Sequence, residues 1–535
     1  MKNKVGWLLS ILLLVSIMVV SCNPAPATAP APTTTTTPAT TAPTTTPTTA
    51  PATKPAATPT PGPAPAKEAP TYGGVLTLVL ANNITGFDAT YTPPWLNYTQ
   101  HLTNEDLLTG DWAKGPAGTG EVSWELATFP AKLDWVTGRL AESWELVDPQ
   151  TIIFHIRKGV RFHNKPPVNG RELTADDVVF TWETYLNAKG FYYATSYGTP
   201  AKRPQATVQD KYTVVVKTPP GMTGDILERF GDNAPIIPQE VVKQYGSLSD
   251  WRNASGTGPF MLVDFVSDSS ASHVKNPNYW MKDPVNPANT LPYVDGVKML
   301  IISDISTRLT ALRTGKVDML AGVGWQDIDG LKRGIPGLKV KTTLSTVYMI
   351  SMRPDTKPFD DIRVRRALNM AIDRPAMIQG LYGGNGVQVL GHIAPLPDYA
   401  DMLVPLEQLP PSSRELFGYH PDTAKKLLAE AGFPNGFKTE VVCTQELVDG
   451  LTVVKDYLSK VGVDMFLDVR ETGVWTSIMV ANSHKQMFMQ YGNPTFPQRL
   501  SELRFGSAMS TWAGKDPVIE QAYLDNYKEY FNPTK

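Results

Sequence analysis

The chain has 535 residues, of which 42% are apolar, 9% aromatic and 19% charged. Its 49 basic and 51 acidic residues leave a net charge of −2. A nucleic-acid-binding protein usually carries a basic stripe, which this composition lacks, so no nucleic-acid partner is expected. The seven histidines form no HExxH or His-x-x-His grouping, and we expect neither a metal site nor a cofactor.

The N-terminus has the pattern of a secretory signal over residues 1–21. Lys2 and Lys4 precede an apolar run from Val5 to Val20, which is shorter than the ~20 residues of a membrane-spanning helix. An uncleaved transmembrane anchor is the alternative. The residues Val-Val-Ser-Cys22 resemble a bacterial lipobox, which implies that Cys22 becomes the lipidated first residue. Cys443 is then the single remaining cysteine, which excludes a disulfide framework and a cysteine-based zinc site.

Residues 22–69 are nearly all proline, threonine and alanine after the cysteine. Such a segment has too little apolar surface to offset the entropy of ordering. We expect a disordered linker with polyproline II character, which would act as a spacer between the membrane and the folded part.

From residue 70 onward, strand-like and helical segments alternate, which predicts an α/β fold. This part is too long for one core and suits two or three lobes. Residues 72–80 read as the first strand, and residues 82–88 as the loop leaving it. Residues 97–127 are glycine-rich and irregular, like an insertion, and the sequence does not assign them a place.

The stretch from Leu140 to Glu183 carries the most orderly local signals. Residues 144–146 and 151–157 alternate apolar and polar side chains around Asp148-Pro149, which predicts a hairpin. Thr174-Ala-Asp-Asp177 has the shape of a capping box and opens an apolar run, which predicts the start of a helix.

The second half continues the alternation. We expect a strand over residues 294–303, then a helix that ends at Gly315. Residues 358–374 form a second helix pattern whose charged residues, Asp361, Arg365 and Asp373, are interpreted as caps and pairs rather than as a catalytic group. Further helices are expected at 420–432 and 516–531, and a helix-to-strand transition at 457–464.

These motifs, in this order, resemble the extracytoplasmic solute-binding proteins of the peptide/nickel ABC importers, bacterial solute-binding family 5. The resemblance covers roughly residues 72–530. It implies a type II periplasmic-binding-protein fold with two main lobes, a hinge and a smaller subdomain in lobe one. Lobe one would span residues 70–300 and lobe two 301–489, with a return to lobe one over 490–535. Because members usually continue beyond the last helix, we expect lobe one to be incomplete.

The resemblance also implies where a ligand would bind. The candidate contacts come from the loop after the first strand, two tryptophan-bearing segments, the strand at 349–353 and a stretch near the second hinge; they are Asn82, Asn83, Trp325, Arg353, Trp475, Gln490, Tyr491 and Asn493.

Two of these candidates bear on specificity. Peptide-binding relatives have an Asp where this chain has Gln490, and that carboxylate pairs with the free α-amino group of the peptide. An ammonium buried without a counter-ion is costly, which counts against ordinary oligopeptides as the ligand. Arg353 would offer a bidentate anchor to a carboxylate or phosphate. The alternative is an exposed Arg353 paired with Asp355.

We therefore expect the lipid-anchored, monomeric solute-binding subunit of an ABC importer, working with permease and ATPase subunits. The solute would be a modified or short peptide, an opine- or sugar-like compound, or a metal chelate. A ligand-presenting sensory protein is the first alternative. A surface hydrolase is the second, but the chain has no GxSxG, Walker loop or other nucleophile and base at a recognisable spacing.

Overall fold

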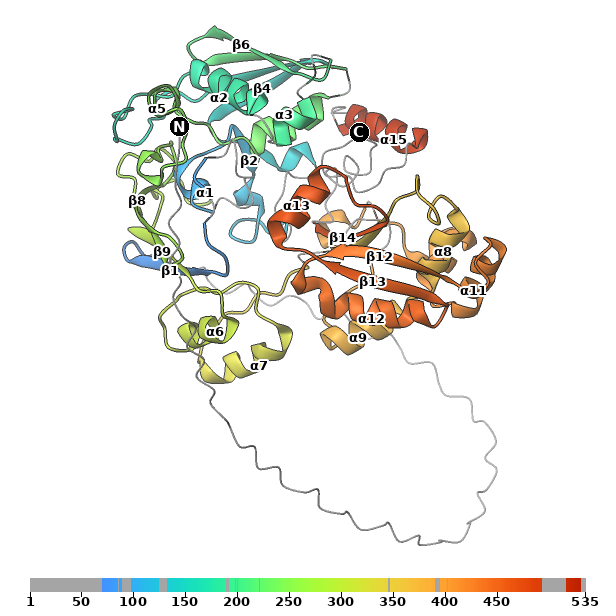
Figure 1. Cartoon of the computed structure of the whole chain (residues 1–535). Coiled ribbons are helices and arrows are strands. Elements are labelled where there is room, and N and C mark those ends of the chain that lie inside the picture. The colour runs from blue at the N-terminus through green and yellow to red at the C-terminus, as the bar shows by residue number, and fades with distance from the viewer. Residues whose placement is uncertain are drawn as a thin grey trace, which may run out of the picture. The chain divides into compact units, whose positions relative to one another are not determined.

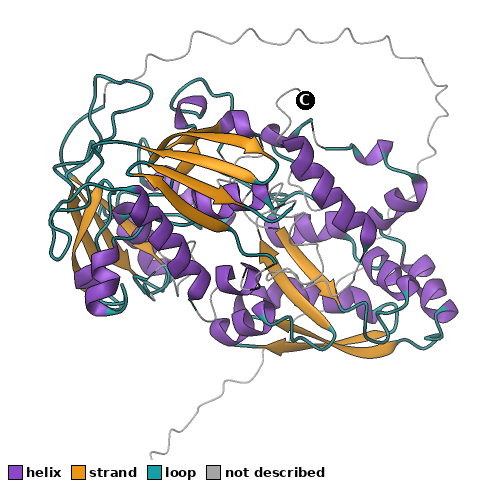
Figure 2. Ribbon diagram, turned by 90° about the horizontal axis from the view of Figure 1, so that it is seen from above, coloured by secondary structure: helices purple, strands orange, loops and turns teal. Residues whose placement is uncertain are grey.

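The structure of the protein is a computed structural model, drawn as a cartoon in Figure 1. The residues that it describes are 70–84, 86–88, 98–124, 132–188, 192–197, 199, 201–220, 222–344, 347–389, 395–401, 403–492 and 516–530. The predicted signal and linker, Cys22 and Asn493 lie outside these residues. Within them the strands form three four-stranded sheets and one two-stranded sheet, and helices pack between them, which confirms the α/β class (Figure 2).

The first sheet has the order β1-β10-β9-β8. Its strands are β1 (Val75–Leu80), β10 (Gly296–Ile301), β9 (Ser270–Lys275) and β8 (Phe260–Val266). β1 and β10 run parallel, while β9 is antiparallel to both of its neighbours. The strands predicted near residues 72–80 and 294–303 are thereby confirmed, and they lie side by side although more than 200 residues separate them.

Two helices follow β10, namely α6 (Ile305–Arg313) and α7 (Trp325–Gly334). α6 ends just before Gly315, whose φ of +65° fits the predicted glycine stop. Beyond it the chain returns to the first sheet, because Asp318 donates its backbone N–H to the carbonyl of Thr77 at 2.9 Å. Contact with the first sheet thus continues past residue 300, and the predicted lobe limits stay a prediction.

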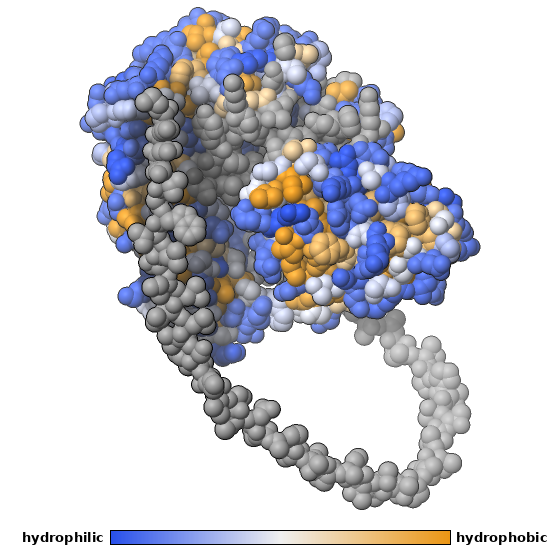
Figure 3. All heavy atoms as spheres, viewed as in Figure 1, coloured by the Kyte–Doolittle hydropathy of each residue, from blue (hydrophilic) through white to orange (hydrophobic). Residues whose placement is uncertain are grey.

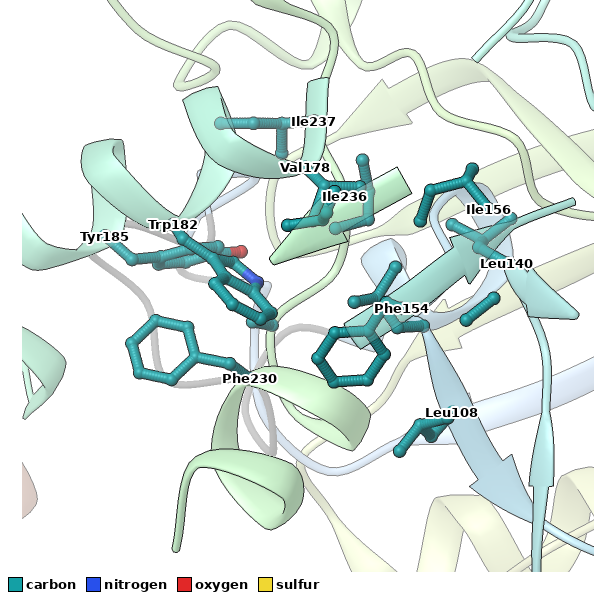
Figure 4. Packing of buried hydrophobic residues seen from close by; sticks show 14 of the residues in the cluster. Leu108, Leu140, Phe154, Ile156, Val178, Trp182, Tyr185, Phe230, Ile236 and Ile237 are labelled. Carbon is teal, nitrogen blue, oxygen red and sulfur yellow. The ribbon is translucent and has the colours of Figure 1, made fainter. Parts of the chain in front are cut away.

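The second sheet has the order β4-β5-β7-β6 and contains the predicted hairpin. Its strands are β4 (Ala141–Asp148), β5 (Thr151–Ile156), β7 (Thr213–Lys217) and β6 (Gln205–Asp210). The helices beside it are α2 (Ala175–Asn187), α3 (Tyr192–Tyr197), α4 (Thr223–Ile226) and α5 (Gln239–Tyr245). Figure 4 shows their shared core, in which Trp182 of α2 lies between Phe154 of β5 and Phe230.

α2 begins where the capping box predicts. The side chain of Thr174 and that of Asp177 satisfy each other's backbone N–H groups, which would otherwise be left without partners at the helix start. Asp177 is fully buried and also accepts a fork of hydrogen bonds from Arg171, at 2.5 and 2.7 Å. Arg171 in turn binds Glu240 of α5. One arginine therefore ties the cap of α2 to a second helix.

The third sheet has the order β11-β14-β12-β13. Its strands are β11 (Val347–Met352), β14 (Met487–Gly492), β12 (Phe437–Cys443) and β13 (Val463–Val469). One face packs on α8 (Ile362–Met370), α11 (Pro421–Glu430) and α12 (Val448–Ser459). The other face carries α13 (Thr472–Val480), and Phe466 of the edge strand β13 is 63% exposed. Figure 3, in the view of Figure 1, shows apolar residues on the surface over α13 and the third sheet.

The interpretation of the charged residues near α8 is confirmed. Asp361 accepts a hydrogen bond from the backbone N–H of Arg363 at 2.8 Å and caps α8, and Asp373 caps α9 (Arg374–Tyr382) in the same way. Arg365 donates to the carbonyl of Phe359 at 2.6 Å. All three act in the local architecture, as helix caps and as a side chain bound to the preceding loop.

The remaining elements are small or peripheral. They are α1 (Gln100–Thr103), the two-stranded sheet of β2 (Leu108–Gly110) and β3 (Val136–Gly138), α10 (Pro411–Arg414) and α15 (Pro517–Tyr530). α15 lies where the final helix is predicted and contacts α4 beside the second sheet. We call the part built on the first two sheets lobe one, and the part built on the third sheet lobe two.

Among the described residues, no helix combines the length and the apolar character needed to cross a membrane.

Candidate functional site

The loop after β1 is tied to the neighbouring hairpin through Asn83. Its amide Nδ2 donates to Ser267 Oγ at 2.9 Å. Its Oδ1 accepts from the backbone N–H groups of Ile84 at 2.9 Å and Asp268 at 3.1 Å. Asn82 is exposed. The side chain of Asn83 thus holds the loop in shape, and a ligand contact by either asparagine stays a prediction.

Trp325 is the first residue of α7, and its side chain reaches across to lobe two. It is 45% exposed, and its ring lies against Gly383, the residue that follows α9. A Cβ atom on Gly383 would lie 2.7 Å from Cη2 of Trp325, closer than van der Waals contact allows. The two elements approach this closely only because residue 383 has no side chain. Trp325 therefore presents an aromatic surface where α7 meets α9.

Arg353 follows β11 and is occupied by its own lobe. Its Nε and Nη2 atoms donate to both carboxylate oxygens of Asp355, at 2.9 and 2.6 Å. Its Nη1 donates to the backbone carbonyls of Asn482 at 2.8 Å and His484 at 3.3 Å. This is the pairing with Asp355 that the sequence left open. Every nitrogen of the guanidinium has a partner, either in Asp355 or in the segment before β14, which leaves no free fork for a ligand anion.

Trp475 lies on α13 and packs inside lobe two. It is 4% exposed, and its ring stacks on Phe488 with centroids 5.1 Å apart. Its indole N–H donates to the carbonyl of Met489 at 3.1 Å. These surroundings are those of a core residue that fastens α13 to β14. Contact with a ligand stays a prediction for Trp475, and the structure gives it none of the exposure that such contact requires.

Gln490 shares a face of β14 with this tryptophan cluster. Successive side chains of a strand point to opposite faces, so Gln490 and Phe488 lie on the α13 side, while Met487 and Met489 pack into the opposite core. Gln490 is 9% exposed and pairs with Met349 of β11. Tyr491 continues the strand opposite Tyr348. The structure thus brings Gln490 and Trp475 to one face of the sheet, whereas the guanidinium of Arg353 is engaged by Asp355 and by the segment before β14.

Sequence reasoning missed a buried histidine beside this cluster. His484 is 3% exposed, and its ring lies 5.4 Å from that of Phe488. Neither ring nitrogen has a hydrogen-bond partner among the described residues. Burial, followed by the positive charge of Arg353, lowers the pKa of His484 to about 4, so the ring is neutral near pH 7. A lone histidine between polar neighbours carries no sequence signal of such burial.

A buried carboxylate in lobe one was missed as well. Glu105 is fully buried and accepts hydrogen bonds from Arg139 at 3.0 Å, Tyr279 at 2.8 Å and Trp280 at 3.0 Å. Burial raises the pKa of the adjacent Asp106 to about 8, against the lowering effect of Arg139. Tyr279 and Trp280 lie more than 170 residues beyond Glu105 in the chain, so only the folded structure brings them together. Because each oxygen of Glu105 has partners, this group ties three segments of lobe one together.

Metal-ligating residues do not gather in the described part of the chain, where no group of three His, Cys, Asp or Glu is placed to hold a metal ion. Cys443 is buried on β12, and burial raises the pKa of its thiol. A raised pKa keeps the thiol protonated and unreactive.

Comparison with known proteins points to one family. The model of the bacterial extracellular solute-binding proteins, family 5 (middle), matches residues 136–517, which is more than half of the chain. Heme-binding protein A of Haemophilus influenzae is 29% identical over 318 residues, or 56% of this chain and 54% of that protein. The dipeptide-binding protein of Escherichia coli is 29% identical over 325 residues, or 56% of each chain. These alignments span about half the length of the curated relatives.

Solved structures share the fold. A periplasmic binding protein of Helicobacter pylori in complex with the peptide STSA superposes with a TM-score of 0.65 at 21% identity, covering 86% of this chain and 90% of the other. A dipeptide-binding protein of Pseudoalteromonas in complex with Met-Leu gives a TM-score of 0.66 at 19% identity, with the same coverages. The fold is that of the type II periplasmic binding proteins, as predicted. The motifs, the fold and the family model agree, and the chain belongs to the bacterial extracellular solute-binding proteins of family 5.

Proposed function

We propose that this chain is the substrate-binding subunit of an ABC importer, which captures a solute by closing its two lobes and delivers it to membrane permeases. The observation that carries this proposal is the two-lobed fold in which the chain passes between lobes more than once. The segments near Met299–Ser303 and Met487–Tyr491 would be the hinges. A few residues at the ends of such elements absorb the backbone rotation when lobes close.

Two arguments limit the chemical class of the solute. Solved relatives of the same fold are described in complex with a peptide, with agropinic acid and with mannohexaose. At Gln490 a neutral amide would face the ligand where peptide-binding relatives carry a carboxylate. An amide accepts a hydrogen bond from an ammonium but does not neutralise its charge. We therefore propose a peptide-like or related solute that lacks a free α-ammonium group.

Other carboxylates are poorly placed to substitute for the missing one. Asp88 is 4% exposed and accepts a hydrogen bond from the backbone N–H of Leu248 at 3.0 Å. Asp464 lies on the edge strand β13 beside Lys438, at 3.7 Å. Asp355 is held by Arg353. Each already has a partner in its own part of the fold, which supports the proposal that an ammonium would remain unpaired.

The chain would work outside the cytoplasm as a monomer, anchored by a lipid on Cys22 and set off from the membrane by residues 22–69. The family name supports an extracellular place of action. A permease pair and two ATPases would be its partners. A sensory protein that presents its ligand to a receptor is the second candidate, and neighbouring genes for permeases or for a chemoreceptor would separate the two.

Mass spectrometry of small molecules that co-purify with the full chain is the experiment that tests this function. We expect a bound solute, and small-angle scattering should show a smaller radius of gyration when that solute is added back. A radius that does not respond to it would argue for a structural surface protein. Chemical turnover of the bound solute would instead favour the hydrolase alternative.

A further inference from the structure

Residues 97–127, to which the sequence assigns no position in the fold, include a segment that makes a specific contact with lobe two. We define the clasp as residues 111–124 and 132–135, which lie between β2 and β3 of lobe one. Ser123 donates its backbone N–H and its hydroxyl to the two carboxylate oxygens of Asp398, both at 2.9 Å. Lys132 forms an ion pair with Asp401 at 2.8 Å. The partners are about 270 residues apart in the chain.

Besides the polar contacts Ser123–Asp398 and Lys132–Asp401, the clasp and lobe two share an apolar cluster. Val122 and Trp135 of the clasp pack with Leu396 and Tyr399 of lobe two, and all four are less than 10% exposed. The ammonium of Lys132 also lies 4.9 Å from the centre of the Trp135 ring. Polar contacts thus flank a small dry centre, the arrangement of a specific interface rather than of a chance approach.

The clasp is held in shape by lobe one alone. Asp111 donates its backbone N–H to the carbonyl of Trp135 at 2.7 Å, and Val122 donates to Lys114 at 3.0 Å. Lys114 Nζ donates to the carbonyl of Asp134 at 2.6 Å. The indole N–H of Trp135 donates to Glu121 at 3.1 Å. None of these bonds involves lobe two, so they would remain intact if the contact between the clasp and lobe two opened.

The acceptor side lies on an excursion of the chain between elements of lobe two. Asp398 and Tyr399 lie in the 3-10 turn η6 (Pro397–Tyr399), on the excursion that follows α9. Beyond it, Glu415 pairs with Arg366 of α8, and the carbonyl of Leu416 accepts from Asn369 at 2.9 Å. One half of the contact is therefore part of lobe one, and the other half belongs to lobe two by its place in the chain.

From these contacts we propose that the clasp, residues 111–124 and 132–135, reversibly fastens lobe one to lobe two when the lobes close. The contact consists of four buried side chains and two polar contacts, and small polar interfaces of this kind between domains open and re-form readily. Because the bonds that shape the lobe-one half do not involve lobe two, opening of the contact leaves that half intact. This inference rests on the proposed lobe closure.

Native-state hydrogen exchange on the full chain tests whether the contacts Ser123–Asp398 and Lys132–Asp401 open together. The variant Asp401→Ala removes only the ion pair with Lys132. If the clasp opens as one unit, the rate of amide hydrogen exchange should rise about two- to fivefold. This factor corresponds to the stabilisation that an exposed ion pair provides. The rate should rise at the Ser123 amide and over residues 395–401 as well as near Lys132, because a shared opening governs all of them.

Three further variants serve as controls for this exchange experiment. Lys132→Ala also removes the contact of the ammonium with Trp135, so it should speed up exchange at least as much as Asp401→Ala. The double variant should match Lys132→Ala, since the ion pair is already absent without Lys132. Asp456→Ala breaks an exposed ion pair with Lys460, 2.7 Å long, inside α12 and should leave the clasp unchanged. Exchange that rises near Lys132 but stays constant at Ser123 would overturn the clasp. No solute is needed, so this result is independent of whether solute capture is found.

Discussion

Buried neutral histidines should make the fold sensitive to mild acid, and His163 offers the cleanest test. His163 is fully buried in lobe one, between two of the motifs noted in the sequence. Its ring Nε2 lies 3.0 Å from the carbonyl of Gly258, and its Nδ1 accepts from the backbone N–H of Gly256 at 3.3 Å. Burial lowers the pKa of His163 to about 4, from an ordinary value near 6.5.

The direction of the pH effect follows from that pKa. The unfolded chain takes up a proton at this histidine below about pH 6.5, whereas the folded chain does so only near pH 4. Stability is therefore complete above pH 6.5 and falls as the pH is lowered toward 4. Between pH 7 and pH 5 the loss from this one group is about 2 kcal/mol. His273 and His484, whose pKa values burial also lowers to about 4, should add to it.

The test compares His163→Gln with the parent chain by urea unfolding at pH 7 and pH 5. Glutamine keeps a donor and an acceptor but does not titrate. The loss of unfolding free energy between the two pH values should be about 2 kcal/mol smaller in the variant, while contributions from carboxylates cancel. His155→Gln, on the half-exposed side of β5, is the control. Equal pH dependence in His163→Gln and the parent would refute the reasoning.

Three further predictions address the anchor, the ligand and the packing. Cys22→Ser should abolish labelling by radioactive fatty acid, and unchanged labelling would end the lipid-anchor proposal. Gln490→Asp should gain affinity for unmodified tri- to pentapeptides by about ten- to a hundredfold in calorimetry, because an unpaired charge costs about 1–3 kcal/mol; tight binding by the parent chain would contradict this. Gly383→Ala should lower the thermal midpoint, because its Cβ would meet Trp325 and its φ of +56° is strained for alanine; Gly380→Ala, which meets no atom within 4 Å, is the control.

The sequence by itself determined those features that depend on neighbours in the chain. The hairpin of β4 and β5, the capped start of α2, the caps of α8 and α9, and the glycine stop after α6 all lie where local patterns predict them. Each follows from hydrogen bonds or backbone preferences within a few residues. The family followed in turn, because several such motifs occur in one order.

Only the tertiary structure decided what surrounds the individual side chains. Trp475 belongs to a core because α13 lies on one face of the third sheet, and Arg353 is engaged because the segment before β14 passes beside it. The clasp has no local sequence signature, since Ser123 and Asp398 bond to each other from distant parts of the chain. Burial, pKa and pairing depend on residues that the fold brings together from distant parts of the chain, and a single sequence read locally carries no record of those distances.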